Sequence, residues 1–301
     1  GAPPDSSRVG LFQPSIPALR QIYGWETKAV PKAERVLSGR FNLFGQTEEI
    51  NIGFPPSWNR QPAFDSYPRS QPLKSTLHWS KVSTSGVTDI KYIWEPSRFS
   101  WVYTLGRAYA ASGDQRWFDG FIQLLDSWCA VNPPNAGPQW ISGQEVALRL
   151  LAMIFAMDAF AEELEGRPGR ARNLRVFLAV HASRIPSTLL YARVQGNNHL
   201  ISEALGLYAA GAALPEHRSA RRWRKLGRRW LVQSIGEQVF HDGGYVQHSH
   251  TYARLALQEG LLGAVLAAHL DEPLPADTLT SLSRMAGLLR AMTDPQTGHV
   301  P

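Results

Sequence analysis

The chain has 301 residues, of which 44% are hydrophobic and 19% charged, so it can bury a large core and is not a disordered linker. Lysine and arginine number 31 against 25 aspartates and glutamates, which favours an anionic partner: nucleic acid, an acidic polysaccharide or a membrane surface. A single cysteine, Cys129, excludes an internal disulfide and a cysteine-rich zinc site. No window approaches the roughly 18 apolar residues that cross a bilayer, and the first residues lack a signal-peptide pattern.

The first 90 residues are rich in proline, which resists long helices. They include Pro55, Pro56, Pro62, Pro68 and Pro72. We therefore expect residues 1–90 to form an irregular N-terminal segment packed on a larger body, which residues 91–301 would form.

From about Pro96 onward, amphipathic stretches separated by short breaks predict an all-α body. The first helix ends at Gly113, and Asp114 caps the next one. That second helix is expected to turn Phe118, Ile122, Leu125 and Cys129 inward. Further helices are predicted near 170–192, 198–213, 217–238, 249–270 and 277–293.

A capping box gives the firmest helix start in the sequence. Ser142 is followed three residues later by Glu145, a spacing in which the two side chains satisfy each other's backbone N–H groups. Paired antiparallel helices with short turns suggest an α/α toroid, incomplete in this chain, or a solenoid. The absence of a fixed sequence period argues against the solenoid.

Asn197, Asn198 and His199 stand directly before an apolar helix. One asparagine there is usually a helix cap, and the histidine could simply be solvated. The cap explains one asparagine but not the triplet. Because backbone N–H groups and the helix dipole favour an anion at this end, the three side chains could complete a carboxylate pocket.

Histidine and tyrosine side chains crowd the segment from Asp242 to Tyr252. Gly243 and Gly244 permit a tight backbone path there. His248 and His250 could bind a metal, but no third ligand stands at suitable spacing, so we expect no metal. Tyr252 could also be an ordinary core residue.

These motifs resemble the helical domain of heparinase II/III-like polysaccharide lyases, and also alginate lyases of that fold. The resemblance runs from about residue 40 to the end. It rests on the following stretches: Trp94-Glu95-Pro96-Ser97-Arg98, Gly143-Gln144-Glu145 through Arg149, Asn197-Asn198-His199-Leu200, and Asp242-Gly243-Gly244-Tyr245 through Tyr252. It implies an α/α toroid followed by a β-sandwich, cleavage of uronic-acid polysaccharides by β-elimination, and an exported (periplasmic or secreted) bacterial protein.

Two features depart from that pattern. Residues 294–301 resemble the junction into the β-sandwich, so we expect that domain to be absent from this chain, or a partner chain to complete the cleft. His248 and His250 stand where relatives often have other polar residues, which would alter the substrate or the proton relay.

The resemblance and the chemistry of elimination together assign roles. The reaction needs a group that neutralises the uronate carboxylate, for which Asn198 and His199 are suited, and a base and acid, for which Tyr252 is the candidate. Since an ordinary tyrosine has a pKa of about 10, a tyrosine base requires positive charge nearby. The expected substrate-binding residues are Glu95, Arg98, Gln144, Arg149, Asn197, His248, His250 and Arg254. No cofactor is expected.

Other functions stay open. A glycoside hydrolase on the same fold would use Glu95, Glu145 and Asp242 as acids and bases. A noncatalytic polysaccharide-binding or assembly protein would keep the fold without the chemistry. The basic run between Arg218 and Arg229 is best interpreted as the solvated face of a helix, and no nucleic-acid signature accompanies it. Exposed tryptophans, of which Trp58, Trp101 and Trp140 are candidates, could stack on sugar rings.

Overall fold

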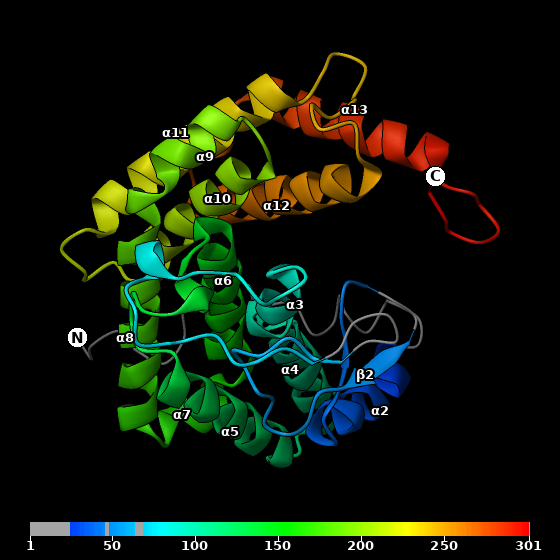
Figure 1. Cartoon of the computed structure of the whole chain (residues 1–301). Helices are drawn as coiled ribbons and strands as arrows, with labels where there is room; N and C mark the ends of the chain where they lie inside the picture. Colours follow the sequence, from blue (N-terminus) through cyan, green and yellow to red (C-terminus); the bar gives the residue numbers. More distant parts are fainter. Residues whose placement is uncertain (1–24, 46–47, 64–68, 301) are drawn as a thin grey trace. The chain divides into compact units, whose positions relative to one another are not determined.

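The computed structural model describes residues 25–45, 48–63 and 69–300, and it is mostly helical, which confirms the predicted fold class (Figure 1). The α-helices are α2 (Trp25–Leu37), α3 (Lys91–Trp94), α4 (Ser100–Ser112), α5 (Arg116–Val131), α6 (Gly143–Ala159), α7 (Ala161–Glu165), α8 (Pro168–Arg184), α9 (Leu189–Gln195), α10 (Asn198–Ala213), α11 (Ala220–Gln238), α12 (His250–His269) and α13 (Ala276–Met292). The short elements are strands β1 (Arg40–Asn42) and β2 (Glu49–Asn51) and 3-10 helices at Trp79–Lys81, Glu95–Arg98, Pro138–Trp140 and Ile185–Ser187.

The chain forms two compact units, residues 1–180 and 181–301, and the division falls within α8. None of the helices in the described ranges combines the length and apolar character needed to cross a membrane. The predicted separation of residues 1–90 from 91–301 stays a prediction. Each compact unit is described below by itself.

In the first unit the proline-rich N-terminal part is more regular than its composition suggests. Residues 25–37 form helix α2 in spite of Pro31. Strands β1 and β2 pair antiparallel, with Phe41 opposite Ile50. Residues 52–63 and 69–90, which follow β2 in the described part of the chain, have little regular structure apart from the 3-10 helix at Trp79–Lys81, as the prolines predict.

An aromatic core fills the first unit. Phe99 lies between Trp101, Trp128 and Phe177, with ring centroids 5.0 to 6.1 Å apart. The suggestion that Trp58, Trp101 or Trp140 is exposed is wrong, because all three are buried. Their rings serve the core and cannot stack on a sugar in this state.

Helix α5 corrects a second expectation. Phe118 and Leu125 are buried as predicted, but Cys129 is exposed and Trp128 takes the inward position. The next residue along a helix is rotated by about 100°, so a buried indole at 128 directs residue 129 away from the core. The helix before it ends as predicted, at Gly113 with φ of 66°. Asp114 Oδ1 accepts a hydrogen bond from the backbone N–H of Arg116 at 2.9 Å, but the N-cap residue of α5 is Gln115, one residue after the predicted cap, and its side chain makes no capping hydrogen bond.

In the second unit α10 and α11 form a tightly packed pair. A Cβ atom added at Gly227 would lie 2.3 Å from the backbone nitrogen of Tyr208, and one added at Gly211 would lie 2.5 Å from that of Arg224. The two glycines therefore allow the helix backbones to approach closely. The predicted boundaries of α10, α11, α12 and α13 agree with the structure to within three residues.

The helix predicted over residues 170–192 is wrong in one respect. The structure has α8 up to Arg184, a 3-10 turn, and then the separate helix α9. Pro186 explains the break, because proline lacks the N–H that a continuous helix needs and its ring clashes with the preceding turn.

Candidate active site

The start of α10 contains the Asn197-Asn198-His199 motif. Asn197 is the cap: its side-chain oxygen accepts a hydrogen bond from the backbone N–H of His199 at 3.0 Å. Asn198 is almost fully buried, with 2% of its surface exposed, whereas His199 is partly exposed. The simple capping interpretation therefore holds for Asn197, and Asn198 is a buried polar residue that capping does not explain.

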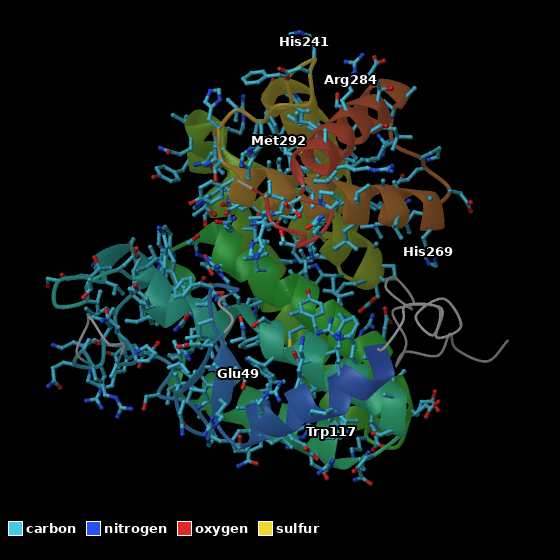
Figure 2. The ribbon with its side chains drawn as sticks, turned by 90° about the vertical axis from the view of Figure 1, so that its right-hand side faces the viewer. Glu49, Trp117, His241, His269, Arg284 and Met292 are labelled. Carbon is cyan, nitrogen blue, oxygen red and sulfur yellow. The ribbon has the colours of Figure 1, made fainter. Side chains whose placement is uncertain are left out.

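The segment from Val239 to Ser249 makes the tight turn that its glycines predict. The backbone N–H of Phe240 donates to the carbonyl of Gly244 at 2.8 Å, and Gly243 has φ of 89°. A Cβ at Gly243 would lie 2.4 Å from the carbonyl oxygen of Arg284 in α13. Figure 2 shows His241 at the tip of this turn, at the same end of the second unit as Arg284.

Gln238, the last residue of α11, connects this turn to α10. Its side-chain N–H donates to the carbonyl of Asn197 at 3.1 Å, and its side-chain oxygen accepts from the Tyr245 hydroxyl at 2.7 Å. Gln247 adds a second connection, because its side-chain oxygen accepts from the backbone N–H of Asn198 at 3.0 Å. These bonds join the Asn-Asn-His motif and the Asp-Gly-Gly segment.

The other end of the turn leads directly into α12. Ser249 caps that helix by accepting a hydrogen bond from the backbone N–H of Tyr252 at 3.4 Å. Tyr252 is 37% exposed, so it is not an ordinary core residue. His248 and Arg254 are exposed, His250 is partly exposed, and His248 has φ of 49°. The N-terminal cluster, as we call Asn197 to His199 together with Gln247 to Tyr252, thus combines two helix starts.

A buried acid lies beneath the N-terminal cluster. Glu259 of α12 accepts a hydrogen bond from the Ser202 hydroxyl at 2.7 Å, and that hydroxyl also lies 3.2 Å from the carbonyl oxygen of Asn198. Burial raises the pKa of Glu259 to about 8, against a smaller lowering by the Ser202 hydrogen bond. The acid is therefore mostly neutral at pH 7.

The first unit contains a separate ion cluster. Arg98 donates to both carboxylate oxygens of Glu145, each at 2.8 Å, and also pairs with Glu95. Burial raises the pKa of Glu95, and the charge of Arg98 opposes this effect. The predicted capping box is thus only half formed, since Ser142 accepts from the Glu145 N–H at 3.4 Å while the Glu145 carboxylate binds Arg98.

Two other predicted ligand-binding residues of this unit are enclosed. Arg149 is fully buried, donates to the backbone carbonyls of Gln139 and Ser97, and lies 5.1 Å from the Trp128 ring centroid. Gln144 is 5% exposed. The structure gives Arg149 a packing role, and neither residue presents its side chain to solvent within this unit.

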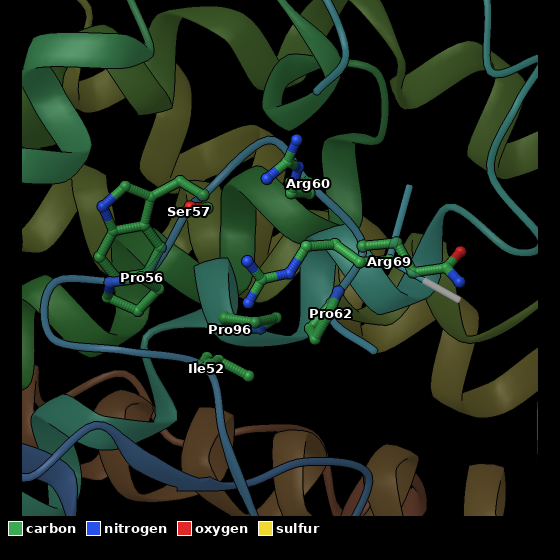
Figure 3. A pocket seen from close by; sticks show the side chains of 9 residues that line it. Ile52, Pro56, Ser57, Arg60, Pro62, Arg69 and Pro96 are labelled. Atoms are coloured by element: carbon green, nitrogen blue, oxygen red, sulfur yellow. The ribbon is translucent and has the colours of Figure 1, made fainter. Parts of the chain in front are cut away.

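A small hollow of about 10 Å³ lies next to Pro96 in the same unit, and its rim carries Arg60 and Arg69 (Figure 3). No sequence motif marks these two arginines, because they lie in the irregular segment. Gln238, Gln247 and Glu259 were not predicted as site residues either. The one sign of Glu259 in the sequence is that it is an acidic residue among apolar neighbours in α12.

No group of three or more histidine, cysteine, aspartate or glutamate side chains within residues 25–45, 48–63 and 69–300 is placed to hold a metal ion. Asp242, an acid candidate for hydrolysis, is exposed, and its side chain accepts a hydrogen bond from the N–H of Gly244 at 2.8 Å. That bond shapes the turn.

Residues 56–300 match the profile of the family described as heparinase II/III N-terminus. The chain belongs to this family. The match confirms the resemblance carried by the motifs.

The chain is also similar to individual proteins whose names agree with this family. The chain is 26% identical over 204 residues to a heparin-sulfate lyase of Bacteroides thetaiotaomicron, a match covering 66% of this chain and 28% of the relative. It is 23% identical over 216 residues to a heparin-sulfate lyase of Pedobacter heparinus, covering 69% of this chain and 32% of the relative. The chain therefore spans less than a third of the length of these curated relatives.

Solved structures show the same fold. One of heparinase III aligns with a TM-score of 0.58 and 20% identity over 97% of this chain and 47% of that one. A heparan sulfate lyase of Pedobacter heparinus aligns with a TM-score of 0.54 and 19% identity over 99% of this chain and 42% of that one.

Proposed function

We propose that this chain is part of a polysaccharide lyase that cleaves a uronic-acid-containing anionic polysaccharide by β-elimination. Family membership supports this proposal, as do the relatives, which are named heparin-sulfate lyases. The net charge of +6 suits an anionic polymer.

One observation carries the assignment of the site: the hydrogen bond from the Asn198 N–H to Gln247. Asn198 is the first residue of α10, and Gln247 lies three residues before the first residue of α12. Two helix N-termini therefore belong to one cluster. Because each is the positive end of a helix dipole, together they favour a carboxylate.

The residues of the N-terminal cluster suit the steps of elimination. His199, which is partly exposed, would neutralise the uronate carboxylate, which makes the adjacent C5 proton easier to remove, and the nearly buried Asn198 would support this position from within the cluster. Tyr252, exposed at the start of α12, would accept that proton as its phenolate and become the neutral phenol. The C5–H electron pair then forms the C4–C5 double bond as the C4–O4 bond breaks, and the phenol returns a proton to O4.

The remaining side chains would position the sugar. Asn197, His248, His250 and Arg254 lie in or next to the N-terminal cluster and supply hydrogen-bond donors and positive charge. In the first unit, Glu95 and Arg98 are the partly exposed polar groups of the ion cluster, and we propose them as separate contacts for hydroxyl or carboxylate groups of the polymer. We do not include the buried Arg149 and Gln144 in these contacts.

The test is incubation with uronate polymers while ultraviolet absorbance is followed. Elimination yields unsaturated ends that absorb, whereas a glycoside hydrolase would release saturated reducing ends. The chain and the complete protein encoded by its gene are assayed in parallel, so that residues outside this chain can contribute. Binding without any product from the complete protein would contradict the lyase proposal and favour a noncatalytic role.

A further inference from the structure

The first half of α11 carries a basic surface that the proposed chemistry does not use. Its cations recur at intervals of three and four residues, so they share one face of the helix. With Glu272 they surround a hollow of about 370 Å³, and we call them the α11 basic face: Arg221, Arg224, Lys225, Arg228 and Arg229.

Two of these arginines are held in place. Arg224 Nε donates to the Glu272 carboxylate at 2.9 Å, and the Tyr208 hydroxyl donates to the same oxygen at 2.7 Å. Arg228 donates to the carbonyl of Pro273 at 2.9 Å. Arranging these side chains before a ligand arrives lowers the entropy cost of binding.

The other three cations have no acid partner. In the described part of the chain, no carboxylate forms an ion pair with Arg221, Lys225 or Arg229. Among the residues that line the hollow, Glu272 is the one acid. Burial alone would raise its pKa, but the hydrogen bonds from Arg224 and Tyr208 and the charges of Arg224 and Arg228 together lower it. The hollow therefore keeps a large excess of positive charge.

The surroundings favour a flexible polyanion over a membrane or nucleic acid. Trp223 and Trp230 are buried, so the helix offers no exposed indole on which bases could stack. It also has no exposed large apolar side chain to insert into a lipid surface. What remains is a charged hollow whose guanidinium and ammonium groups suit carboxylate or sulfate groups.

The α11 basic face is separate from the N-terminal cluster. Gln238, which binds Asn197, lies at the far end of the same helix. With a rise of about 1.5 Å per residue, Gln238 is roughly 14 Å from Arg229 and 26 Å from Arg221 along the axis. A polymer several sugars long could contact both places, whereas a short oligosaccharide could not.

We propose that the α11 basic face is a second binding site for a linear anionic polysaccharide, distinct from the place where elimination occurs. That the bound polymer is also the substrate rests on the proposed function. Binding of the polysaccharide at the α11 basic face does not depend on the proposed function.

The experiment compares two triple variants of the complete protein. The test variant is Arg221→Gln with Lys225→Gln and Arg229→Gln, which leaves the held Arg224 and Arg228 in place. The control variant is Arg284→Gln with Arg290→Gln and Lys81→Gln, which removes the same charges from exposed positions elsewhere. Circular dichroism and the melting temperature verify that both variants fold.

Binding to immobilised heparan sulfate is measured over a salt series. We expect the test variant to bind about tenfold more weakly and with a shallower salt dependence, while the control keeps the parent affinity. For the active protein, KM for long polymer rises without a change in kcat, and turnover of short oligosaccharides is unaffected. Absence of turnover would overturn the proposed function but leave the binding result valid.

Three outcomes would overturn the proposal itself. One is equal affinity of the test variant and the parent protein. Another is an equal loss in the control variant, which would mean that only net charge matters. The third is tighter binding of the parent to polyuridylate or to phosphatidylserine vesicles than to heparan sulfate, lost in the test variant, which would make the face a nucleic-acid or membrane site.

Discussion

Tyr252 is the side chain on which the proposed elimination depends most. We expect Tyr252→Phe to lower kcat by about 10² to 10⁴, because it removes the proton acceptor and donor while keeping the ring. Polymer affinity should change little. Tyr191→Phe, at a 63% exposed tyrosine of α9, is the matched control and should leave kcat unchanged. Rates of product formation, followed by ultraviolet absorbance, and binding isotherms measure the two effects. An unchanged kcat in Tyr252→Phe would remove the phenol from the mechanism.

Gln238 shows how a residue outside the reacting groups can hold the site together. In Gln238→Leu the carbonyl of Asn197 and the hydroxyl of Tyr245 lose a buried partner. We expect the free energy of unfolding to fall by about 1 to 3 kcal/mol, and kcat to fall as well. Urea titration measures the first effect. Gln233→Leu, which affects a surface hydrogen bond to Glu237 on the same helix, should cost less than half as much.

The turn between α11 and α12 depends on Gly243. An alanine there would need φ near 89° and would place its Cβ 2.4 Å from the carbonyl of Arg284. We expect Gly243→Ala to destabilise the protein by at least about 2 kcal/mol, because α13 must move or the turn must open. Gly236→Ala is the control: it lies inside α11 with open space around it and should be neutral or stabilising. The melting temperatures of the two variants measure the difference. Equal changes in Gly243→Ala and Gly236→Ala would contradict this account of the turn.

The helical elements show what local sequence can predict. The start of α10 was predicted correctly because Gly196 and Asn197 are local signals, a left-handed residue and a cap. The prediction of one continuous helix through Pro186 was wrong. It relied on the apolar periodicity, although proline lacks the backbone N–H that a continuous helix needs. Glu145 was predicted as the partner of Ser142, yet Arg98, which is distant in sequence, binds its carboxylate. An ion pair between residues distant in sequence cannot be predicted from the local sequence around either of them.

At the scale of the whole chain, the motifs predicted the family, and the roles of the site residues stay predictions. The joining of Asn198 to the segment that leads to Tyr252 was expected from family resemblance, but the glutamines that make it were not. Their amides lie at a helix end and in a turn, where glutamine is usually solvated. The ion cluster of Glu95 and Arg98 belongs to the other compact unit, so its part in binding stays a prediction.

Two buried acids make the stability of the folded chain depend on pH. Burial raises the pKa of both Glu203 and Glu259 to about 8, from the usual value of 4.5. The folded state therefore holds protons that the unfolded state releases, and the stabilisation is complete below pH 4.5 and is lost as pH rises through 8. Each group can contribute up to about 1.4 kcal/mol per pH unit within this window.

We accordingly expect the free energy of unfolding to fall by a few kcal/mol between pH 5 and pH 8. Glu259→Gln keeps the shape of the side chain but cannot ionise, so its stability should depend on pH less steeply than that of the parent. Glu162→Gln, at an exposed position, should follow the parent curve. Urea titrations at half-unit pH intervals provide the comparison. A parent curve that is flat over this range, or a slope unchanged in Glu259→Gln, would mean that Glu259 is ionised in the folded protein and that the acid beneath the N-terminal cluster is not neutral.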